Sequence, residues 1–413
     1  MTPDGGRKGV GVRVAAVRRQ RGITQMELAA LVGRTPSWVS QVERGVQPVA
    51  RLDVLQLLAN ALGVSTQALN PDAPTPMPVP AVGADEPNDL DMARLALSGH
   101  PALGVLLSAE DRMGLPSLSE LSRQVDDVWA LIHAAKFAEL SVLVDPLLDR
   151  LETAVRSAPD RERPALYALL ARTYQALAAA FARQDEADAA WVAADRAIRA
   201  AEQSNDVLGT FAGIYRLAQA FVRLKRLDQA EHAATTAVRA LETHGAAQLG
   251  RSEGLSVLGA LHLALALVHA RAGNRDQARS EIEEARTIAR RLGADRNDFN
   301  LEFGPTNVEI QAVSTAVDLG DAGEALDVGA RIDAGALSPE RQSRLLMDLG
   351  RAHVQRRHVG DAVECLLRAE ELAPETVRSH VAARGAIHEL TLIAGRSAPA
   401  ELLALAERAA ALD

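Results

Sequence analysis

The chain has 413 residues with one cysteine, a net charge of −9, 48% hydrophobic residues and only 3% aromatic residues. Such a length accommodates two or three domains, and a composition rich in alanine and leucine favours helices over a β-rich fold. The single Cys365 excludes an intrachain disulfide. The sequence contains no phosphate-binding glycine loop, zinc-type Cys/His spacing or nucleophile elbow. We therefore expect an all-α protein that is not an enzyme and uses neither a cofactor nor a metal.

The net charge conceals a difference between the two ends of the chain. Residues 1–70 carry nine Lys or Arg against four Asp or Glu, a balance of +5, which leaves −14 on the remainder. A cationic N-terminal segment joined to an acidic body is suited to a polyanionic partner that contacts the N-terminal segment alone.

The first strongly predicted element is a helix that begins after Thr24. Thr24 and Glu27 have the spacing of a capping box, in which each side chain accepts a hydrogen bond from the other residue's backbone amide. Leu28 and Leu31 give this helix an apolar stripe. Gly33 follows as its C-terminal glycine, because glycine adopts a positive φ at little cost.

A second helix is predicted to begin after a tight turn. Thr35 followed by Pro36 is the pattern of an N-cap and a proline at the first helical position. Val39 and Val42 have the i, i+3 spacing of a buried face, and Gly45 ends the helix. The residues on or near the outer face are Ser37, Trp38, Gln41 and Arg44.

Residues 9–70 resemble the helix-turn-helix domain of the XRE family, the Cro and phage-repressor type. The motif positions that carry this resemblance are Gln25, Leu28, Ala29, Gly33, Ser40, Glu43, Arg44 and Gly45. Residues 14–18 are similar to the family's first helix, and residues 52–62 and 63–69 to its last two. The resemblance implies a five-helix DNA-binding domain over residues 1–70. It further implies a palindromic operator in double-stranded DNA, bound by a homodimer.

The resemblance also implies which side chains contact DNA. These are Gln25, Thr35, Pro36, Ser37, Trp38, Ser40, Gln41 and Arg44. Gln41 can donate and accept together, which suits adenine. Trp38 either contacts DNA or packs partly buried in the domain. Arg44 either contacts a phosphate or pairs with Glu43 or Glu27. Pro36 offers no base-edge hydrogen bond, which favours readout through water or DNA shape at its position.

The rest of the chain is predicted to be a linker followed by helices alone. Residues 71–88 hold six prolines, which predicts an extended linker. Over residues 89–413, hairpin-turn signatures place alanines 40, 48, 47 and 37 residues apart at Ala190, Ala230, Ala278, Ala325 and Ala362. Recurrence at this period predicts an α-solenoid. The helix pairs resemble tetratricopeptide repeats, so residues 89–413 are predicted to be a sensor and dimerisation domain.

The first helix of each pair in such a solenoid lines a concave groove. Projection of the repeat phase places there Arg172, Gln175, Arg183, Tyr215, Gln219, Arg223, Arg271, Asn307, Arg344, Arg351 and Gln355. We predict that an effector binds Tyr215, Gln219, Arg223, Arg271, Asn307 and Arg351. Arginine binds carboxylates and phosphates through a fork of donors, whereas pairing with the body's own glutamates is the alternative for each one.

Residues 295–307 interrupt the helical pattern with polar residues, two phenylalanines and a Gly-Pro pair. Two interpretations remain open. In the first, Thr306 or Asn307 caps the helix that follows. In the second, the segment forms a wall of the effector pocket and Asn307 binds the effector.

The combination of an XRE-type head and a tetratricopeptide-like body resembles the regulators grouped as RRNPP. That resemblance implies a cytoplasmic, nucleoid-associated transcriptional regulator whose body senses a peptide or a small molecule. The alternative is an interaction scaffold, in which the solenoid binds a protein partner and the head locates the complex on DNA. The most apolar run, residues 255–270, is predicted to be too short to span a bilayer, so no membrane partner is expected.

Overall fold

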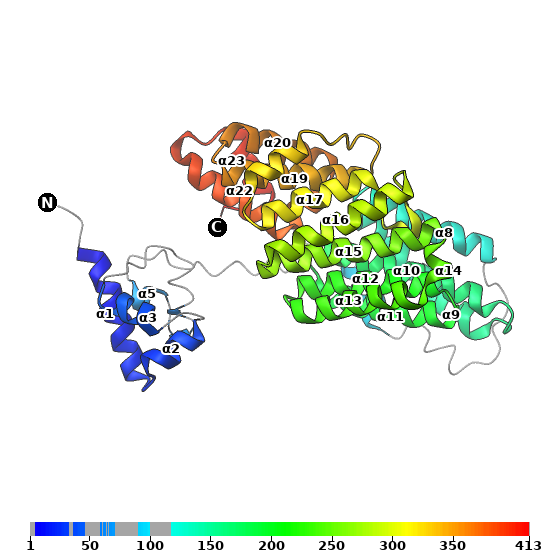
Figure 1. Cartoon of the computed structure of the whole chain (residues 1–413), viewed down its shortest axis with the longest axis horizontal. Coiled ribbons are helices and arrows are strands. Elements are labelled where there is room, and N and C mark those ends of the chain that lie inside the picture. The colour runs from blue at the N-terminus through cyan, green and yellow to red at the C-terminus, as the bar shows by residue number, and fades with distance from the viewer. Residues whose placement is uncertain are drawn as a thin grey trace. The chain divides into compact units, whose positions relative to one another are not determined.

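The computed structural model describes residues 5–32, 36–45, 58–59, 61–62, 64, 66–70, 90–99 and 117–412. The chain divides into two compact units, residues 1–86 and 87–413 (Figure 1), and each is described by itself. Every regular element within the described residues is a helix, so the all-α prediction is confirmed. The predicted linker, residues 71–88, lies outside the described residues.

The N-terminal unit, here called the head, is a cluster of short helices around one small core. Its helices are α1 (Gly5–Gln20), α2 (Gln25–Leu31), α3 (Pro36–Glu43) and α5 (Thr66–Leu69). Of the predicted helix at 52–62, only residues 58–59 and 61–62 are described, and they are helical. The core contains Val10, Val14, Leu28, Ala29, Val32, Val39, Val42, Leu58, Ala59, Leu62 and Leu69.

The capping box, the start of α3 and the glycine that ends it have the geometry predicted from the sequence. The Glu27 backbone amide donates to Thr24 Oγ1 over 3.2 Å, and the Thr24 amide donates to Glu27 Oε2 over 2.7 Å, which completes the capping box. Helix α3 begins at Pro36, and Gly45 has a φ of 73°. The predicted turn glycine, Gly33, lies outside the described residues.

The prediction that Leu31 belongs to the buried stripe is wrong. Leu31 is 59% exposed, whereas Leu28, Ala29 and Val32 are buried. Positions i, i+1 and i+4 of this helix therefore face the core, and position i+3 lies past its edge. The close packing of α1 on α3 also depends on Gly11, because a Cβ there would lie 2.1 Å from the Val42 carbonyl oxygen.

The C-terminal unit, here called the body, is a stack of antiparallel helix pairs. The pairs are α8 (Leu118–His133) with α9 (Phe137–Ser157), α10 (Arg163–Arg183) with α11 (Ala187–Gln203), α12 (Val207–Arg223) with α13 (Leu227–His244), α15 (Ser252–Ala272) with α16 (Arg275–Leu292), α17 (Pro305–Asp318) with α18 (Ala322–Gly329), α19 (Pro339–Gln355) with α20 (Val359–Leu372), and α22 (Val381–Ala394) with α23 (Ala400–Arg408). Short helices α6 (Asp91–Ser98), α14 (Ala246–Leu249) and α21 (Pro374–Ser379) complete it. Figure 1 shows the pairs stacked in chain order towards the red C-terminal end.

The alanine period read from the sequence marks a repeated packing position. Each of these alanines is the fourth residue of the second helix in its pair, and each is fully buried: Ala190, Ala230, Ala278, Ala325 and Ala362. A methyl side chain at this point lets the second helix approach the first closely. The solenoid prediction is thereby confirmed at the level of packing.

The turns inside the pairs share a second feature, a residue with a left-handed backbone. In the turns of the first six pairs, from α8–α9 to α19–α20, the residues with positive φ are Ala135, Asp185, Lys225, Gly273, Gly320 and Arg357. Only two of the six are glycine, although glycine adopts this conformation without the steric cost that a Cβ imposes. The recurring turn is therefore a property of the repeat geometry and is imposed on whichever residue occupies it.

The first and last parts of the array contact each other. The backbone amides of Phe137 and Ala138, at the start of α9, donate to Glu375 Oε2 of α21 over 2.6 and 3.3 Å. Lys136 at the N-cap of α9 provides no side-chain cap, so Glu375 supplies one from 238 residues away. Helix α8 likewise contacts α19.

Helix α15 corrects the prediction about the apolar run. It has 21 residues and is long and apolar enough to cross a bilayer by length and composition. In the structure, however, 83% of its most apolar window is buried inside the body. The run is accounted for by packing, because α15 contacts α12, α13, α16 and α17.

Candidate functional site

In the head, a buried ion pair joins α1 to α3, and a hydrogen bond from α2 reaches the same carboxylate. Arg18 Nε of α1 lies 2.5 Å from Glu43 Oε1 of α3, and Arg18 Nη1 donates to the Ile23 carbonyl over 2.8 Å. Gln25 Nε2 at the start of α2 donates to Glu43 Oε2 over 2.7 Å. Burial opposes the charge of Glu43, but the hydrogen bonds from Arg18 and Gln25 outweigh it and lower the pKa of this carboxyl. The network fixes the mutual position of α1, α2 and α3.

The predicted DNA-contact residues fall into three groups. Thr35 and the side chains of Pro36 and Ser37 lie outside the described residues. Trp38 is half-buried and packs against the core of the head, and Ser40 and Gln41 are also half-buried. Arg44 is exposed and donates to the Ser40 carbonyl over 3.2 Å. Its predicted pairing with an acidic neighbour is not formed, because Arg18 and Gln25 occupy Glu43 while Thr24 occupies Glu27.

In the body, a cavity of about 70 Å³ is lined by the first helices of consecutive pairs. The lining comes from α10, α12, α15, α17 and α19, with His380 at the N-cap of α22. Seven arginines take part: Arg183, Arg216, Arg223, Arg271, Arg341, Arg344 and Arg351. We call this site the arginine pocket. It is lined by the first helices of the pairs, which are the helices that the repeat phase assigns to the groove.

The structure brings five of the six predicted effector residues together in the arginine pocket: Tyr215, Gln219, Arg223, Arg271 and Arg351. The sixth, Asn307, is buried near the start of α17 but does not line the pocket, and its Oδ1 has no hydrogen-bond partner among the described residues. Arg172 also lies outside the pocket, because it pairs with Asp126 over 2.6 Å. Sequence reasoning missed Arg216, Arg341 and His380, which approach the pocket from phases the repeat pattern did not assign to it.

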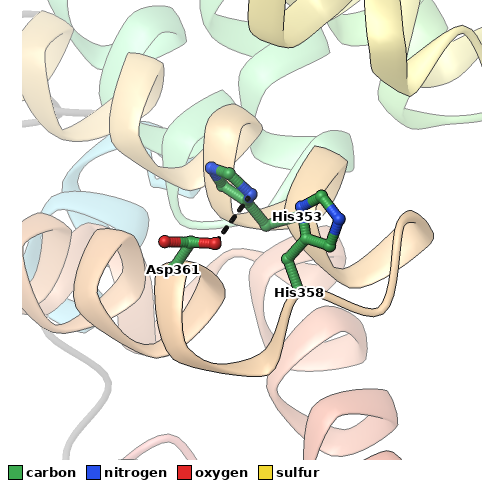
Figure 2. Close-up of side chains that lie close together, drawn as sticks. All are labelled: His353, His358 and Asp361. Atoms are coloured by element: carbon green, nitrogen blue, oxygen red, sulfur yellow. Dashed lines mark ion pairs between the residues drawn. The ribbon is translucent and has the colours of Figure 1, made fainter.

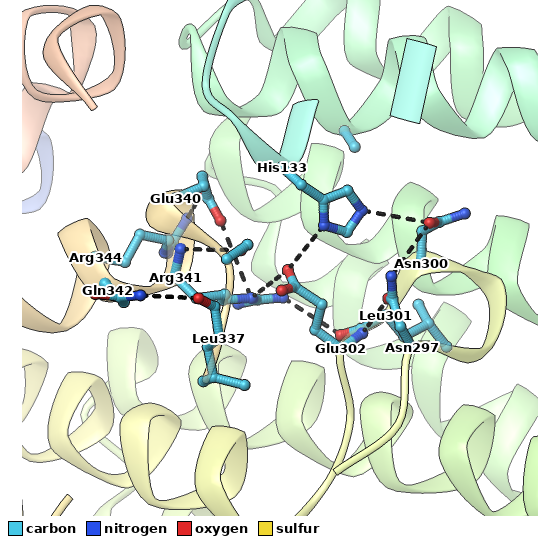
Figure 3. Close-up of polar contacts among 12 residues, drawn as sticks. His133, Asn297, Asn300, Leu301, Glu302, Leu337, Glu340, Arg341, Gln342 and Arg344 are labelled. Atoms are coloured by element: carbon cyan, nitrogen blue, oxygen red, sulfur yellow. Dashed lines mark hydrogen bonds and ion pairs between the residues drawn. The ribbon is translucent and has the colours of Figure 1, made fainter. Parts of the chain in front are cut away.

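A polar network beside the pocket joins α8, the segment before α17, and α19 (Figure 3). Glu302 Oε2 lies 3.2 Å from Arg341 Nε and 3.7 Å from His133 Nδ1, and His133 Nε2 lies 3.3 Å from Asn300 Oδ1. Burial of Glu302 opposes its charge, but His133 and Arg341 outweigh burial and hold the pKa of Glu302 well below its usual value. A second buried carboxylate, Glu340, lies 2.8 Å from Arg183 Nε.

The unusual segment 295–307 is a tight loop that contributes no residue to the lining of the arginine pocket, and the capping interpretation of it is wrong. Neither Thr306 nor Asn307 caps α17: Asp295 does so, accepting from the Thr306 amide over 2.9 Å. Phe303 is fully buried against α15 and does not form a wall of the pocket. Phe299, Asn300 and Glu302 all have positive φ, so the loop is held in a conformation that non-glycine residues rarely adopt.

One further cluster has residue types that can bind a metal (Figure 2). Ligand atoms of His353, His358 and Asp361 lie within 4.8 Å of one another at the α19–α20 turn, outside the arginine pocket. Burial lowers the pKa of His353, which keeps its imidazole neutral and able to coordinate. Two imidazoles and a carboxylate could hold a divalent cation such as zinc. The His-x4-His-x2-Asp pattern has none of the zinc-type Cys/His spacings, and its ligand atoms converge only across a helical hairpin, so it was not recognisable from the sequence.

Comparison with known proteins supports the assignment of the head. Residues 10–71 match the model of the family described as "Helix-turn-helix domain". No curated protein matches the chain. The solved structure of a point mutant of PrgX is similar at 11% sequence identity and a TM-score of 0.26, over 96% of this chain and 99% of that chain.

Proposed function

We propose that this chain, whose residues 10–71 are a helix-turn-helix domain, is a sequence-specific transcriptional regulator controlled by an effector that binds its body. In domains of this type the second helix enters the DNA major groove. The observation that carries the proposal is the network of Arg18, Gln25 and Glu43, which holds α3 rigidly against α1 and α2. A fixed recognition helix suits readout of base edges, because each side chain must reach its base with little freedom.

Within this proposal, the α2–α3 residues named from the sequence make the DNA contacts. Gln41 reads a base edge, and the exposed Arg44 neutralises a phosphate. Gln25 donates one amide hydrogen to Glu43, so its Oε1 and second N–H are directed by that bond and serve a base or a phosphate. Thr35, Pro36, Ser37, Trp38 and Ser40 complete the proposed surface.

The body has two proposed roles, effector binding and dimerisation. The arginine pocket is its strongest candidate for the effector site, because first helices from five consecutive pairs converge on it. A ligand that bridges several repeats can bias the curvature of a solenoid, since each repeat contacts only its neighbours. Dimerisation through the body would present two heads to a palindromic operator in the cytoplasm.

The test is a genome-wide DNA pull-down with the purified chain, followed by titration of a recovered site with and without cell extract. The proposal expects a shared palindrome whose affinity changes with extract. Recovery of random fragments alone would overturn sequence-specific binding. Specific sites with no response to extract would instead favour the scaffold alternative. Light scattering at micromolar concentration tests the dimer, and a monomeric chain would contradict it.

A further inference from the structure

We propose that the arginine pocket binds an oxyanion, namely a carboxylate or phosphate group of the effector. The cavity of about 70 Å³ has room for a few water molecules or for one such group, so the rest of a larger ligand would lie outside it. The inference names the chemical class of the effector and to that extent rests on the proposed function. Binding of anions to the pocket can be measured separately from binding of DNA to the head.

The arginine pocket has more positive than negative side chains. Seven arginines line the pocket. Only five carboxylates among the described residues lie within 4.0 Å of them: Asp185, Glu302, Asp318, Glu340 and Asp348. The pocket therefore concentrates two more positive than negative charges in a body whose overall charge is negative. A buried charge without a partner is costly, so this excess requires an explanation.

The excess positive charge can be assigned by comparing how closely each arginine approaches a carboxylate, as Arg351 and Arg344 show. Arg351 lies 2.6 Å from Asp318 and 2.7 Å from Asp348, so it is fully paired. Arg344 is different, because its nearest carboxylate is Glu340 at 3.9 Å, and Arg183 already binds Glu340 at 2.8 Å. The short contacts of Arg351 show a guanidinium that is fully used in ion pairs within the body. The long contact of Arg344 leaves its guanidinium able to bind an anion in the cavity.

Arg216 is the second incompletely paired arginine. It is almost fully buried and makes no ion pair within the described part of the body. Its Nη2 donates to the Asn300 carbonyl over 2.8 Å, while its Nε has no hydrogen-bond partner among the described residues. Burial, together with the nearby positive charges of Arg183 and Arg341, lowers the pKa of Arg216 to about 10. An anion in the cavity would relieve this repulsion.

A pair of opposed donors supplies an independent argument. His380 Nδ1 accepts from the Ala383 amide over 3.3 Å, so the single proton of the neutral imidazole is on Nε2. That Nε2 lies 3.4 Å from Arg223 Nη2, which is also a donor. Arg223 has its nearest carboxylate, Asp185, at 3.7 Å. Two neighbouring donors in a buried site are both satisfied when one acceptor oxygen lies beside the pair, within hydrogen-bond distance of each nitrogen.

The experiment measures anion binding to the full chain by thermal unfolding and by calorimetric titration. The probes are inorganic phosphate and citrate, each compared with sodium chloride at equal ionic strength. We expect at least one oxyanion to raise Tm in a saturable manner, and the tighter of the two identifies a phosphate or a carboxylate source. If neither probe stabilises the chain beyond chloride, the inference is overturned.

Matched variants separate binding from structure. Arg344→Gln should weaken the oxyanion at least about tenfold without lowering the anion-free Tm, because it removes an incompletely paired charge. Arg351→Gln should lower the anion-free Tm, because it removes the ion-pair partner of Asp348 and the nearer of the two partners of Asp318, which then retains only Arg271 at 3.4 Å. Wild-type affinity in Arg344→Gln would overturn the inference; Arg223→Gln repeats the test if that variant does not fold. Oxyanion binding that leaves operator affinity unchanged would keep the pocket and contradict effector control.

Discussion

The ring of Phe303 occupies the space that a side chain at position 259 would need. A Cβ built on Gly259 of α15 would lie 2.0 Å from the ring. Phe303 is fully buried and anchors the loop that carries Glu302 to its partners. The position of the loop beside the arginine pocket therefore depends on glycine at position 259 of α15, because any side chain there would displace the ring of Phe303.

The substitution Gly259→Ala should consequently destabilise the body by about 1–3 kcal/mol, because it overpacks a filled core. Chemical denaturation of the full chain would measure the change. Gly385→Ala is the matched control: Gly385 is exposed in α22 with nothing within 4 Å of an added methyl group, so alanine should stabilise by about 0.5–1 kcal/mol. Equal effects of the two substitutions would contradict this account.

Glu302 should make stability depend on pH in the acid range. Its folded pKa is depressed by His133 and Arg341, so its contribution is complete above the unfolded value of about 4.3 and declines as pH falls below it. Glu302→Gln should lower the free energy of unfolding by about 3 kcal/mol at pH 7. The difference from wild type should narrow at lower pH.

Denaturation curves collected at several pH values would check this dependence. Glu324→Gln serves as the control, because Glu324 pairs with Arg279 where both side chains are about half exposed. That substitution should change stability by less than about 1 kcal/mol. A Glu302→Gln difference that stays constant from pH 7 into the acid range would refute the prediction.

Two neighbouring residues of the head should affect DNA binding differently. Gln41→Ala should weaken operator binding by about 1–3 kcal/mol and relax one base position, whereas Arg44→Ala should weaken all sequences alike and reduce the salt slope by about 1. Anisotropy titrations on operator and scrambled DNA at several salt concentrations distinguish them. If Gln41→Ala weakens both DNAs equally, Gln41 does not read a base.

The left-handed turns predict a stabilising change. Lys225 has a φ of 59° in the α12–α13 turn, so Lys225→Gly should stabilise the body by about 0.5–1 kcal/mol through relief of backbone strain. Gly273 has a φ of 78° at the equivalent turn of the next pair, and Gly273→Ala should destabilise by a similar amount. Thermal unfolding of the two variants provides the comparison, and a loss of stability in Lys225→Gly would show that its side chain matters more than its backbone.

Local features were predictable from the sequence, and contacts between distant residues were not. The capping box of Thr24 and Glu27 and the buried Ala190 follow from short spacings that helix geometry dictates. Leu31 was misassigned because a seven-residue helix gives too few turns to fix its buried face. His380 could not be placed in the pocket, since its position depends on how the whole array curves.

The hydrogen bonds from the first turn of α9 to the carboxylate of Glu375 in α21 affect how the body folds. An open repeat array can lose its end units one at a time, because each unit is stabilised by its neighbours alone. Here a contact across 238 residues joins α9 of the first pair to α21, which precedes the last pair, so loss of α21 also removes the cap of α9. The body should therefore unfold more cooperatively than an open array, and its assembly should be slowed by the entropy of closing so long a loop.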